Sequence, residues 1–194
     1  MKEIYFATSN EGKVKTLKKS FSDFDIDIVH EPFDFDEPRS ENLRRIAKQK
    51  VLDAYREIHN PTLAQDAGFY INSLNGFPKT LVNHSLETIG MEGILKLLEG
   101  KDRKCEFKNC LAYFQKDFEE PKYFESTVKG SISAEKRGKI PDYAWSKLFL
   151  IFIPEGREKT LAEMSRREFK DWRSERRKHS FTTKSAEWIE GKTR

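Results

Sequence analysis

The sequence has few cysteines, and this scarcity narrows the class of protein. Only two of the 194 residues are cysteine, and these two, Cys105 and Cys110, lie five positions apart in a strand-like stretch. Successive side chains of a strand alternate between its two faces, so cysteines five apart point to opposite faces and we expect no disulfide between them. Their spacing also differs from that of metal-binding cysteines. We therefore expect neither a disulfide-stabilised scaffold nor a cysteine-ligated metal.

Long hydrophobic runs are also missing. No apolar stretch reaches the roughly 18 residues that a membrane-spanning helix needs. The first residues lack the basic start and the apolar run of a secretory signal. We therefore expect a cytoplasmic protein with no membrane partner.

Charged residues, by contrast, are abundant, at 35% of the chain against 37% hydrophobic residues, and the formal net charge is +4. The basic excess lies in residues 157–194, which hold twelve Lys or Arg against seven Asp or Glu. Such an excess favours an anionic partner, either a nucleotide or a nucleic acid. A solvated helix face explains it equally well, because Phe169 and Trp172 gather opposite the basic side chains. We adopt that explanation and expect no nucleic-acid partner.

The stretch YFATSNEGK, residues 5–13, combines a strand end with a helix start. An apolar run ends at Ala7, three polar residues follow, and a Lys-rich helical pattern begins. Hydroxyl groups and unpaired N–H groups at a helix start bind anions, and Lys13 adds positive charge, so the stretch indicates a phosphate site. The alternative is that Ser9 or Asn10 only caps the helix.

The hydrophobic pattern alternates between the periods of strands and helices, which predicts an α/β fold with a mixed β-sheet. The predicted strands, with turns inside the third and the fourth, are residues 3–8, 24–30, 62–72, 104–134 and 147–154. The predicted helices are residues 12–20, 40–58, 86–98, either whole or broken into a pair, and 163–178. Of these segments, 147–154 (KLFLIFIP) is predicted to be the most buried strand.

Two groups of carboxylates indicate a metal site. The loop EPFDFDEPRSE, residues 31–41, crowds Asp34, Asp36 and Glu37 together, and QDAG, residues 65–68, places Asp66 at a predicted strand end before a glycine turn. Mg²⁺ prefers such oxygen ligands and keeps several waters. Taken singly, an acidic loop is more often merely solvated, and an Asp before Gly is more often a turn residue.

The order of these features is more specific than any one of them. FATSNEGK resembles the opening T-[SG]-N-x-x-K motif of the inosine triphosphate pyrophosphatase family, whose members act on non-standard purine nucleotides. AQDAGFYINSLNGFP is similar to that family's A-E-D-S-G stretch and N-G-x-P turn, and ETIGMEGILKLLEG and FIPEGREKTLAEM resemble its archaeal members. Ordered matches over about 150 residues indicate common ancestry. The resemblance implies one domain over residues 1–194, an elongated mixed sheet flanked by helices, two lobes with a central cleft, and a homodimer.

The resemblance also implies an activity, the hydrolysis of a nucleoside triphosphate to its monophosphate and pyrophosphate with Mg²⁺, or alternatively Mn²⁺. The catalytic residues are then Asp66 and Lys13, and the metal ligands are Asp66 and Glu37, with Asp36 as a rival of Glu37. The substrate-binding residues carried over from the family are Thr8, Ser9, Asn10, Lys13, Lys170, Ser174, Glu175 and Arg176.

Several positions depart from the family's pattern. Gln65 replaces the glutamate beside the catalytic aspartate, and Lys79 replaces a glycine at the end of the N-G-x-P turn, a position that can require glycine's φ angle. SKLFL, residues 146–150, stands where the family has F-G-Y-D-P, and PDYAW at 141–145 is only a displaced echo of that stretch.

Glu175 stands where the family has a histidine that reads the base. An ionised glutamate only accepts hydrogen bonds, so it opposes the 6-keto oxygen of hypoxanthine or xanthine and suits an amino group instead. Arg176 or Arg177 is an alternative donor to a keto oxygen. The departures support a second hypothesis as an alternative to this activity, in which the chain binds a nucleotide or a partner without turnover, but hydrolysis stays the leading hypothesis.

Overall fold

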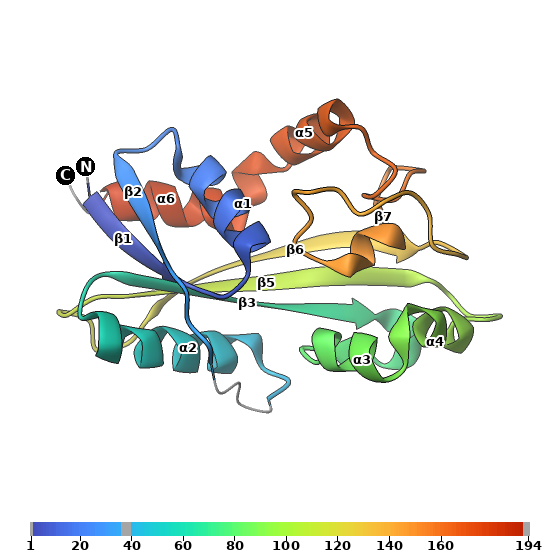
Figure 1. The fold of residues 1–194 in the computed structure, drawn as a ribbon, viewed down its shortest axis with the longest axis horizontal. Coiled ribbons are helices and arrows are strands. Elements are labelled where there is room, and N and C mark those ends of the chain that lie inside the picture. The colour runs from blue at the N-terminus through green and yellow to red at the C-terminus, as the bar shows by residue number, and fades with distance from the viewer. Residues whose placement is uncertain (1, 36–39, 192–194) are drawn as a thin grey trace. The chain divides into compact units, whose positions relative to one another are not determined.

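The computed structural model describes residues 2–35 and 40–191. Within these residues the chain forms seven strands in one sheet, in the order β2-β1-β3-β5-β6-β7, with β4 paired to β3 (Figure 1). The strands are β1 (Lys2–Ala7), β2 (Ile26–Glu31), β3 (Thr62–Ile71), β4 (Pro78–Lys79), β5 (Lys104–Phe114), β6 (Lys122–Ile132) and β7 (Phe152–Pro154). The helices are α1 (Glu11–Phe21), α2 (Leu43–Ile58), α3 (Val82–Thr88), α4 (Gly90–Leu97), α5 (Arg166–Glu175) and α6 (Phe181–Gly191).

The sheet is mixed, as predicted. β1 pairs in parallel with both β2 and β3, whereas β4 is antiparallel to β3 and β7 is antiparallel to β6. Strands and helices alternate from β1 to β3, and β5, β6 and β7 follow with no α-helix between them in the described chain, so the predicted α/β class with a mixed sheet is confirmed. No helix in the described part of the chain is long and apolar enough to cross a membrane.

The chain divides into two compact units. The first unit comprises Met1–Asp66, Asn109–Ser126 and Arg176–Arg194. The second unit comprises Ala67–Lys108 and Thr127–Glu175.

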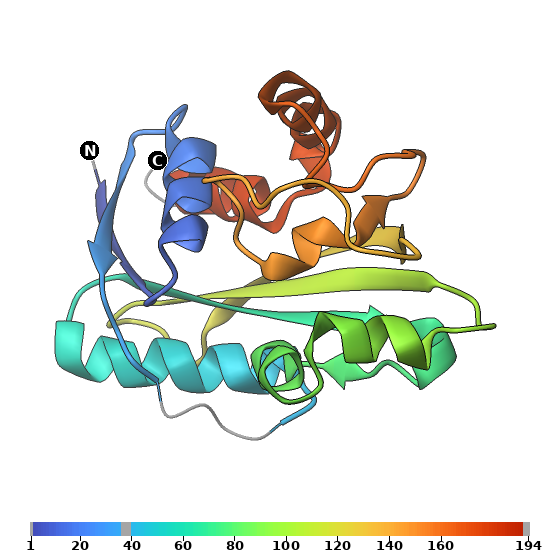
Figure 2. The same cartoon turned by 45° about the vertical axis from the view of Figure 1, so that its right-hand side comes forward.

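In the first unit, helices cover both faces of the strands. α1 and α6 lie together on one face, and α2 lies on the other (Figures 1 and 2). Ile4 and Phe6 of β1 pack with Val14 and Leu17 of α1 in one apolar core, to which α6 adds Ile189. This packing follows from the two periods in the sequence, because alternate strand residues meet one stripe of each helix.

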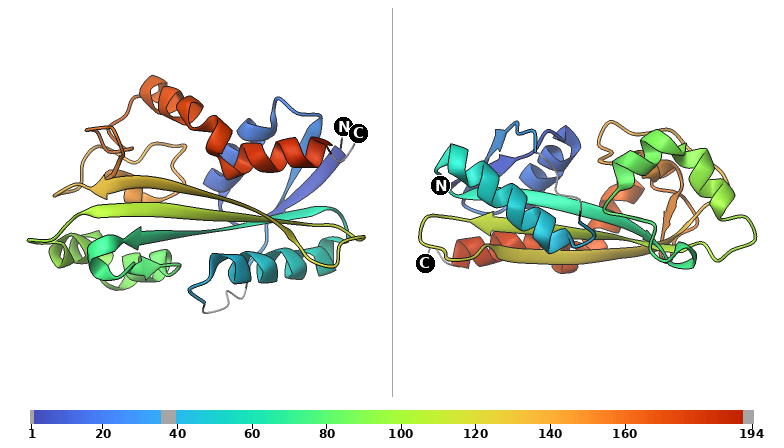
Figure 3. Two further views of the ribbon diagram at one scale, coloured as in Figure 1. Left: turned by 180° about the vertical axis from the view of Figure 1, so that it is seen from behind. Right: turned by 90° about the horizontal axis from the view of Figure 1, so that it is seen from below.

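The second unit has its own core, built largely from aromatic rings. α3 and α4 lie on one face of its strands and α5 on the other (Figures 1 and 3). Phe107 contacts Phe69, Trp145 and Phe152 with ring centroids 4.6–4.8 Å apart. Such rings supply much of the apolar area that a small core can bury.

The strand predicted over residues 147–154 differs from the structure. Residues 147–150 form a 3₁₀ helix with Leu148 and Phe149 fully buried, and only Phe152–Pro154 continue as a strand. A short apolar run does not distinguish a buried strand from a buried helical turn, and the hydroxyl of Ser146, which accepts from the N–H of Leu148, favours the turn.

The last predicted helix, 163–178, is shorter in the structure, and a further helix follows it. α5 spans Arg166–Glu175, and α6 was missed because it buries small polar residues that blur the apolar stripe. Ser185 donates to the carbonyl of Thr182, and this bond satisfies the buried hydroxyl inside the helix.

The two cysteines are both buried and free. Burial raises the pKa of both thiols, and that of Cys110 rises to about 12. They lie on the same strand, β5, at positions of opposite parity.

Lys79 adopts a φ of 56°, in the left-handed region that the family's glycine suits. A residue with a Cβ is strained there by roughly 1–2 kcal/mol, of which the extra backbone entropy of glycine would offset a part. We expect Lys79→Gly to raise the free energy of unfolding by about 0.5–1 kcal/mol, measured by urea denaturation. Lys79→Ala is the matched control, because it removes the side chain but keeps the Cβ. An equal gain in both variants would contradict the explanation.

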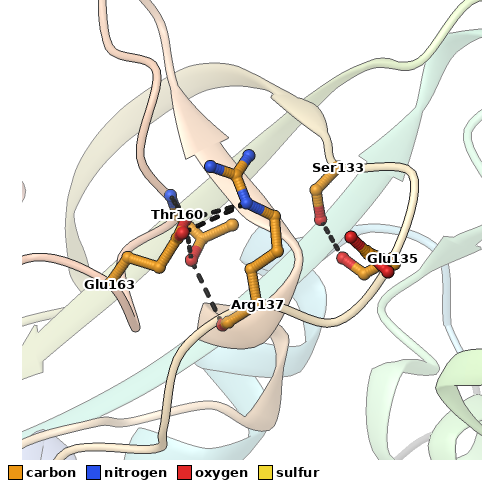
Figure 4. A network of polar contacts seen from close by, with 5 residues as sticks. All are labelled: Ser133, Glu135, Arg137, Thr160 and Glu163. Carbon is orange, nitrogen blue, oxygen red and sulfur yellow. Dashed lines mark hydrogen bonds and ion pairs between the residues drawn. The ribbon is translucent and has the colours of Figure 1, made fainter.

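A polar network holds the chain that leads from β6 into the 3₁₀ helix (Figure 4). Thr160, fully buried, donates through its N–H to Glu163 at 2.8 Å and through its hydroxyl to the carbonyl of Arg137 at 3.3 Å. The Arg137 guanidinium lies 3.1 Å from the Glu163 carboxylate. Burial alone raises the pKa of Glu163, but the bonds from Thr160 and the charge of Arg137 outweigh it and lower the pKa below its usual value.

Because the folded state lowers this pKa, the carboxylate of Glu163 stabilises the fold above the usual glutamate pKa of about 4.3 and loses its effect as the pH falls further. We expect Glu163→Gln to lower the free energy of unfolding by about 1–2 kcal/mol at pH 7. The difference in the free energy of unfolding between the variant and the wild type, measured by denaturant titration, shrinks as the pH falls towards 3. Glu158→Gln, at an exposed position of the same unit, is the control. A gap that stays constant down to pH 3 would refute the role of the charge.

Candidate active site

The turn between β1 and α1 has the geometry of both a helix cap and an anion site. The Asn10 side-chain oxygen accepts from the N–H of Lys13 at 3.0 Å, and the N–H of Asn10 donates to the Thr8 hydroxyl at 3.1 Å. Thr8 is buried, whereas Ser9 is exposed. Asn10, one of the two cap candidates, is therefore the N-cap of α1. The positive end of the α1 dipole lies at the same turn, so capping and anion binding are compatible.

Strand register brings this turn to β3. Tyr5, Phe6 and Ala7 pair in parallel with residues 62–64, so the turn after Ala7 lies beside Gln65. The Lys13 ammonium donates to the carbonyl of Gln65 at 3.4 Å. The turn and the QDAG stretch, more than fifty residues apart in the sequence, thus meet in one place.

Asp66 does not lie at a strand end, contrary to the prediction. β3 runs without a break from Thr62 to Ile71, and Asp66 is buried near its middle. Gly68 marks a close backbone approach rather than a turn: a Cβ there would lie 2.8 Å from the carbonyl oxygen of Lys79 and 2.7 Å from the Tyr70 ring. The position does require a glycine, but the reason is the antiparallel pairing of β4 with β3 and not a turn.

A residue absent from the predicted site, Lys50, binds the Asp66 carboxylate. The Lys50 ammonium donates to Asp66 Oδ1 at 2.9 Å, and the two side chains are 6% and 9% exposed. Lys50 comes from the buried face of α2, between Ala47 and Ala54. The signal that could have found it is a lysine at a core position of an amphipathic helix, where long cations are rarely placed without a partner.

An aromatic ring lies beside this ion pair, and an uncharged amide pair holds the strand position before Asp66. The Gln65 amide donates to the Asn109 side chain at 3.2 Å, so the position where the family has a glutamate holds an uncharged amide pair. The Phe35 ring centroid lies 5.4 Å from the Lys50 ammonium, within the range of a cation–π contact.

The predicted metal ligands are only partly described. Glu37 and its rival Asp36 lie outside the described residues, so the structure places neither of them. Among residues 2–35 and 40–191, no three His, Cys, Asp or Glu side chains are grouped so as to hold a metal ion. Mg²⁺ needs only one or two protein carboxylates when phosphate oxygens and water complete its shell, so the Asp66 carboxylate is a suitable donor.

The predicted substrate-binding residues near the C-terminus lie at the end of α5 and directly after it. Lys170, Ser174 and Glu175 belong to the second unit and are exposed, and Arg176 begins the last segment of the first unit. The Ser174 hydroxyl donates to the carbonyl of Lys170 at 2.9 Å. The apolar side of this helix was predicted correctly, since Phe169 and Trp172 are buried.

Glu175 is bound by an arginine that the sequence analysis did not consider. The Arg157 guanidinium donates to both carboxylate oxygens of Glu175, at 2.6 and 2.5 Å. The aromatic residue of the displaced stretch, Tyr143, stacks on Phe169 with centroids 4.6 Å apart and a 27° interplanar angle.

The fold and the turn define an α/β protein with a capped helix start beside a buried carboxylate. The family model that matches the chain, over residues 4–181, is that of the Ham1 family. The dITP/XTP pyrophosphatase of Pyrococcus horikoshii is 36% identical over 165 residues, which cover 84% of this chain and 85% of the relative. That of Saccharolobus solfataricus is 37% identical over 164 residues, which cover 84% and 82%. The solved structure of the Staphylococcus aureus Ham1 protein has a TM-score of 0.77 at 25% identity and covers 98% of this chain and 100% of its own.

The chain therefore belongs to the Ham1 family. The resemblance to nucleoside triphosphate pyrophosphatases inferred from the sequence motifs is confirmed by these relatives, and so is the fold.

The cap at Asn10 supports a test of the turn by itself. We expect Asn10→Ala to lower the free energy of unfolding by about 1 kcal/mol, because the N–H of Lys13 loses its acceptor, and Asn10→Gly to lower it by only a few tenths. Urea denaturation of both variants measures the difference. If Asn10→Ala were as stable as the wild type, the Asn10 side chain would not be the cap.

Proposed function

We propose that the chain is a nucleoside triphosphate pyrophosphohydrolase, which cleaves a non-standard purine nucleotide such as dITP, ITP or XTP to its monophosphate and pyrophosphate. The observation that carries the proposal is the buried Lys50–Asp66 pair beside the Lys13 turn. It places two ammonium groups, a helix start and a carboxylate together, as triphosphate chemistry requires. The names of the relatives, dITP/XTP pyrophosphatases, support the same substrate class.

Each residue of the turn has a separate task in this proposal. The N–H groups at the start of α1 and the hydroxyls of Thr8 and Ser9 bind phosphate oxygens, and Asn10 keeps the turn in shape. Lys13 neutralises charge on the phosphates. Lys50, whose ammonium is bonded to Asp66, supplies a second ammonium.

Asp66 orients the water nucleophile or accepts its proton and is a proposed metal ligand together with Glu37. Mg²⁺, or Mn²⁺, when bound would clamp phosphate oxygens and favour the attacking form of water. The proposed donors, the carboxylates of Asp66 and Glu37, are oxygen atoms, which hard ions such as Mg²⁺ and Mn²⁺ prefer. Cys110, the thiol whose pKa is influenced by Asp66, stays protonated at neutral pH and does not compete as a ligand.

The proposed base-reading residues are Lys170, Ser174, Glu175 and Arg176. The Arg157 guanidinium binds both carboxylate oxygens of Glu175. Its positive charge reduces the repulsion between this carboxylate and the keto oxygen of a purine. This contact favours a keto purine over an amino purine. We further propose, on the family resemblance, that the enzyme acts in the cytoplasm as a homodimer.

The test is pyrophosphate release from dITP, ITP, XTP, GTP, ATP and the pyrimidine triphosphates, with and without Mg²⁺. We expect the keto purines to be cleaved fastest and only with the metal. Asp66→Asn lowers kcat/KM by about 100-fold or more, and Lys13→Met raises KM by about tenfold or more. Lys15→Met, exposed on the same helix, is the control for lost charge.

Two outcomes would contradict the proposal. Hydrolysis that survives Asp66→Asn would remove Asp66 from the chemistry. Binding of nucleotide without any pyrophosphate release would favour the second hypothesis, a family member that has kept the scaffold and lost turnover.

A further inference from the structure

The Lys50–Asp66 contact gives one carboxylate two competing cations. The ammonium of Lys50 lies 2.9 Å from Asp66 Oδ1. Both side chains are less than one-tenth exposed, so water screens their charges weakly. A divalent cation that binds Asp66 therefore lies close to a fixed positive charge and is repelled by it.

Two groups that the structure describes near Asp66 bring no negative charge of their own. The Lys13 ammonium, bonded to the carbonyl of Gln65, is positive. The Cys110 thiol is neutral at pH 7, since burial raises its pKa to about 12.

A triphosphate reverses the balance. It brings several negative charges to the helix start, and an ammonium group is a flexible point charge that can turn from a carboxylate to a phosphate. Each such contact releases the Asp66 oxygens for a metal. If bound nucleotide increases the affinity for the metal by some factor, then bound metal increases the affinity for the nucleotide by the same factor.

We propose that Lys50 is a charge gate, which weakens divalent-metal binding at Asp66 in the nucleotide-free protein and is drawn away by the triphosphate, so that metal and nucleotide bind cooperatively. The gate rests on the proposed function, because it needs a triphosphate to open. It makes Lys50 a positioning residue, whose effect on metal binding is opposite in sign to its effect on nucleotide binding.

The experiment measures Mn²⁺ binding to the full chain without nucleotide, by electron paramagnetic resonance of free Mn²⁺. Lys50→Gln removes the ammonium, and Lys50→Arg keeps the charge. Arg45→Gln, which removes an exposed cation from the same helix, controls for long-range charge. Asp66→Asn identifies the binding that belongs to this carboxylate.

We expect Lys50→Gln to bind Mn²⁺ about tenfold more tightly than the wild type, a typical size for coupling between sites. Lys50→Arg and Arg45→Gln remain at the wild-type affinity, and Asp66→Asn loses the gain when it is combined with Lys50→Gln. Unchanged or weaker Mn²⁺ binding by Lys50→Gln would overturn the gate. An equal gain in Arg45→Gln would also overturn it, because general charge would then explain the effect.

Removing the ammonium leaves a buried carboxylate, so Lys50→Gln can fail to fold without metal. The wild type alone also decides the matter: the gate requires its nucleotide-free affinity for Mn²⁺ to exceed that of Asp66→Asn by less than about tenfold. A much larger excess would overturn the proposal.

Failure of the gate and failure of the proposed function are separable. Mn²⁺ binding is measured without turnover, whereas pyrophosphate release is measured on the wild type. If the wild type releases pyrophosphate but Lys50→Gln does not bind Mn²⁺ more tightly, only the gate is refuted. A gain in Lys50→Gln with no release from any nucleotide sinks the proposed activity and leaves the Lys50–Asp66 competition standing.

Discussion

The buried contact between Lys50 and Asp66 is the constraint on which the organisation of the first unit depends. Two charges removed from water are costly to bury, and the fold tolerates them only because their distance is short and their surroundings are fixed. The buried face of α2 delivers the ammonium, and an unbroken β3 delivers the carboxylate. The parallel pairing of β1 with β3 then sets the Lys13 turn next to them. The ion pair therefore joins α2 to β3, and the strand pairing brings β1 and the turn to the same place.

What the sequence predicted well were features decided by neighbouring residues. The helix predicted at 12–20 is found at Glu11–Phe21, and the long helix ends at Ile58 as expected. The cap at Asn10 and the strained turn residue Lys79 were also visible locally, because each depends on the backbone of a few adjacent residues. The family resemblance rested on such local motifs in a fixed order, which is why it identified the fold.

What the sequence could not predict depends on contacts between distant segments. Lys50 looked like an ordinary helical lysine, and only the sixteen-residue return of the chain to β3 reveals its partner. Asp66 was misplaced because Gly68 resembles a turn glycine, whereas the nearness of Lys79 across the strand pair is what excludes a side chain there. Arg157, eighteen residues from Glu175, escaped notice for the same reason.

The placement of the two cysteines has a further consequence. β5 carries one thiol in each compact unit, Cys110 in the first and Cys105 in the second. Only a thiolate attacks an alkylating reagent, and burial keeps both groups protonated and covered. Each cysteine is therefore labelled only when its own surroundings open. The labelling rate of each cysteine therefore reports the local unfolding of the unit that contains it. Equal rates indicate that both units open in one event, and different rates indicate that they open separately.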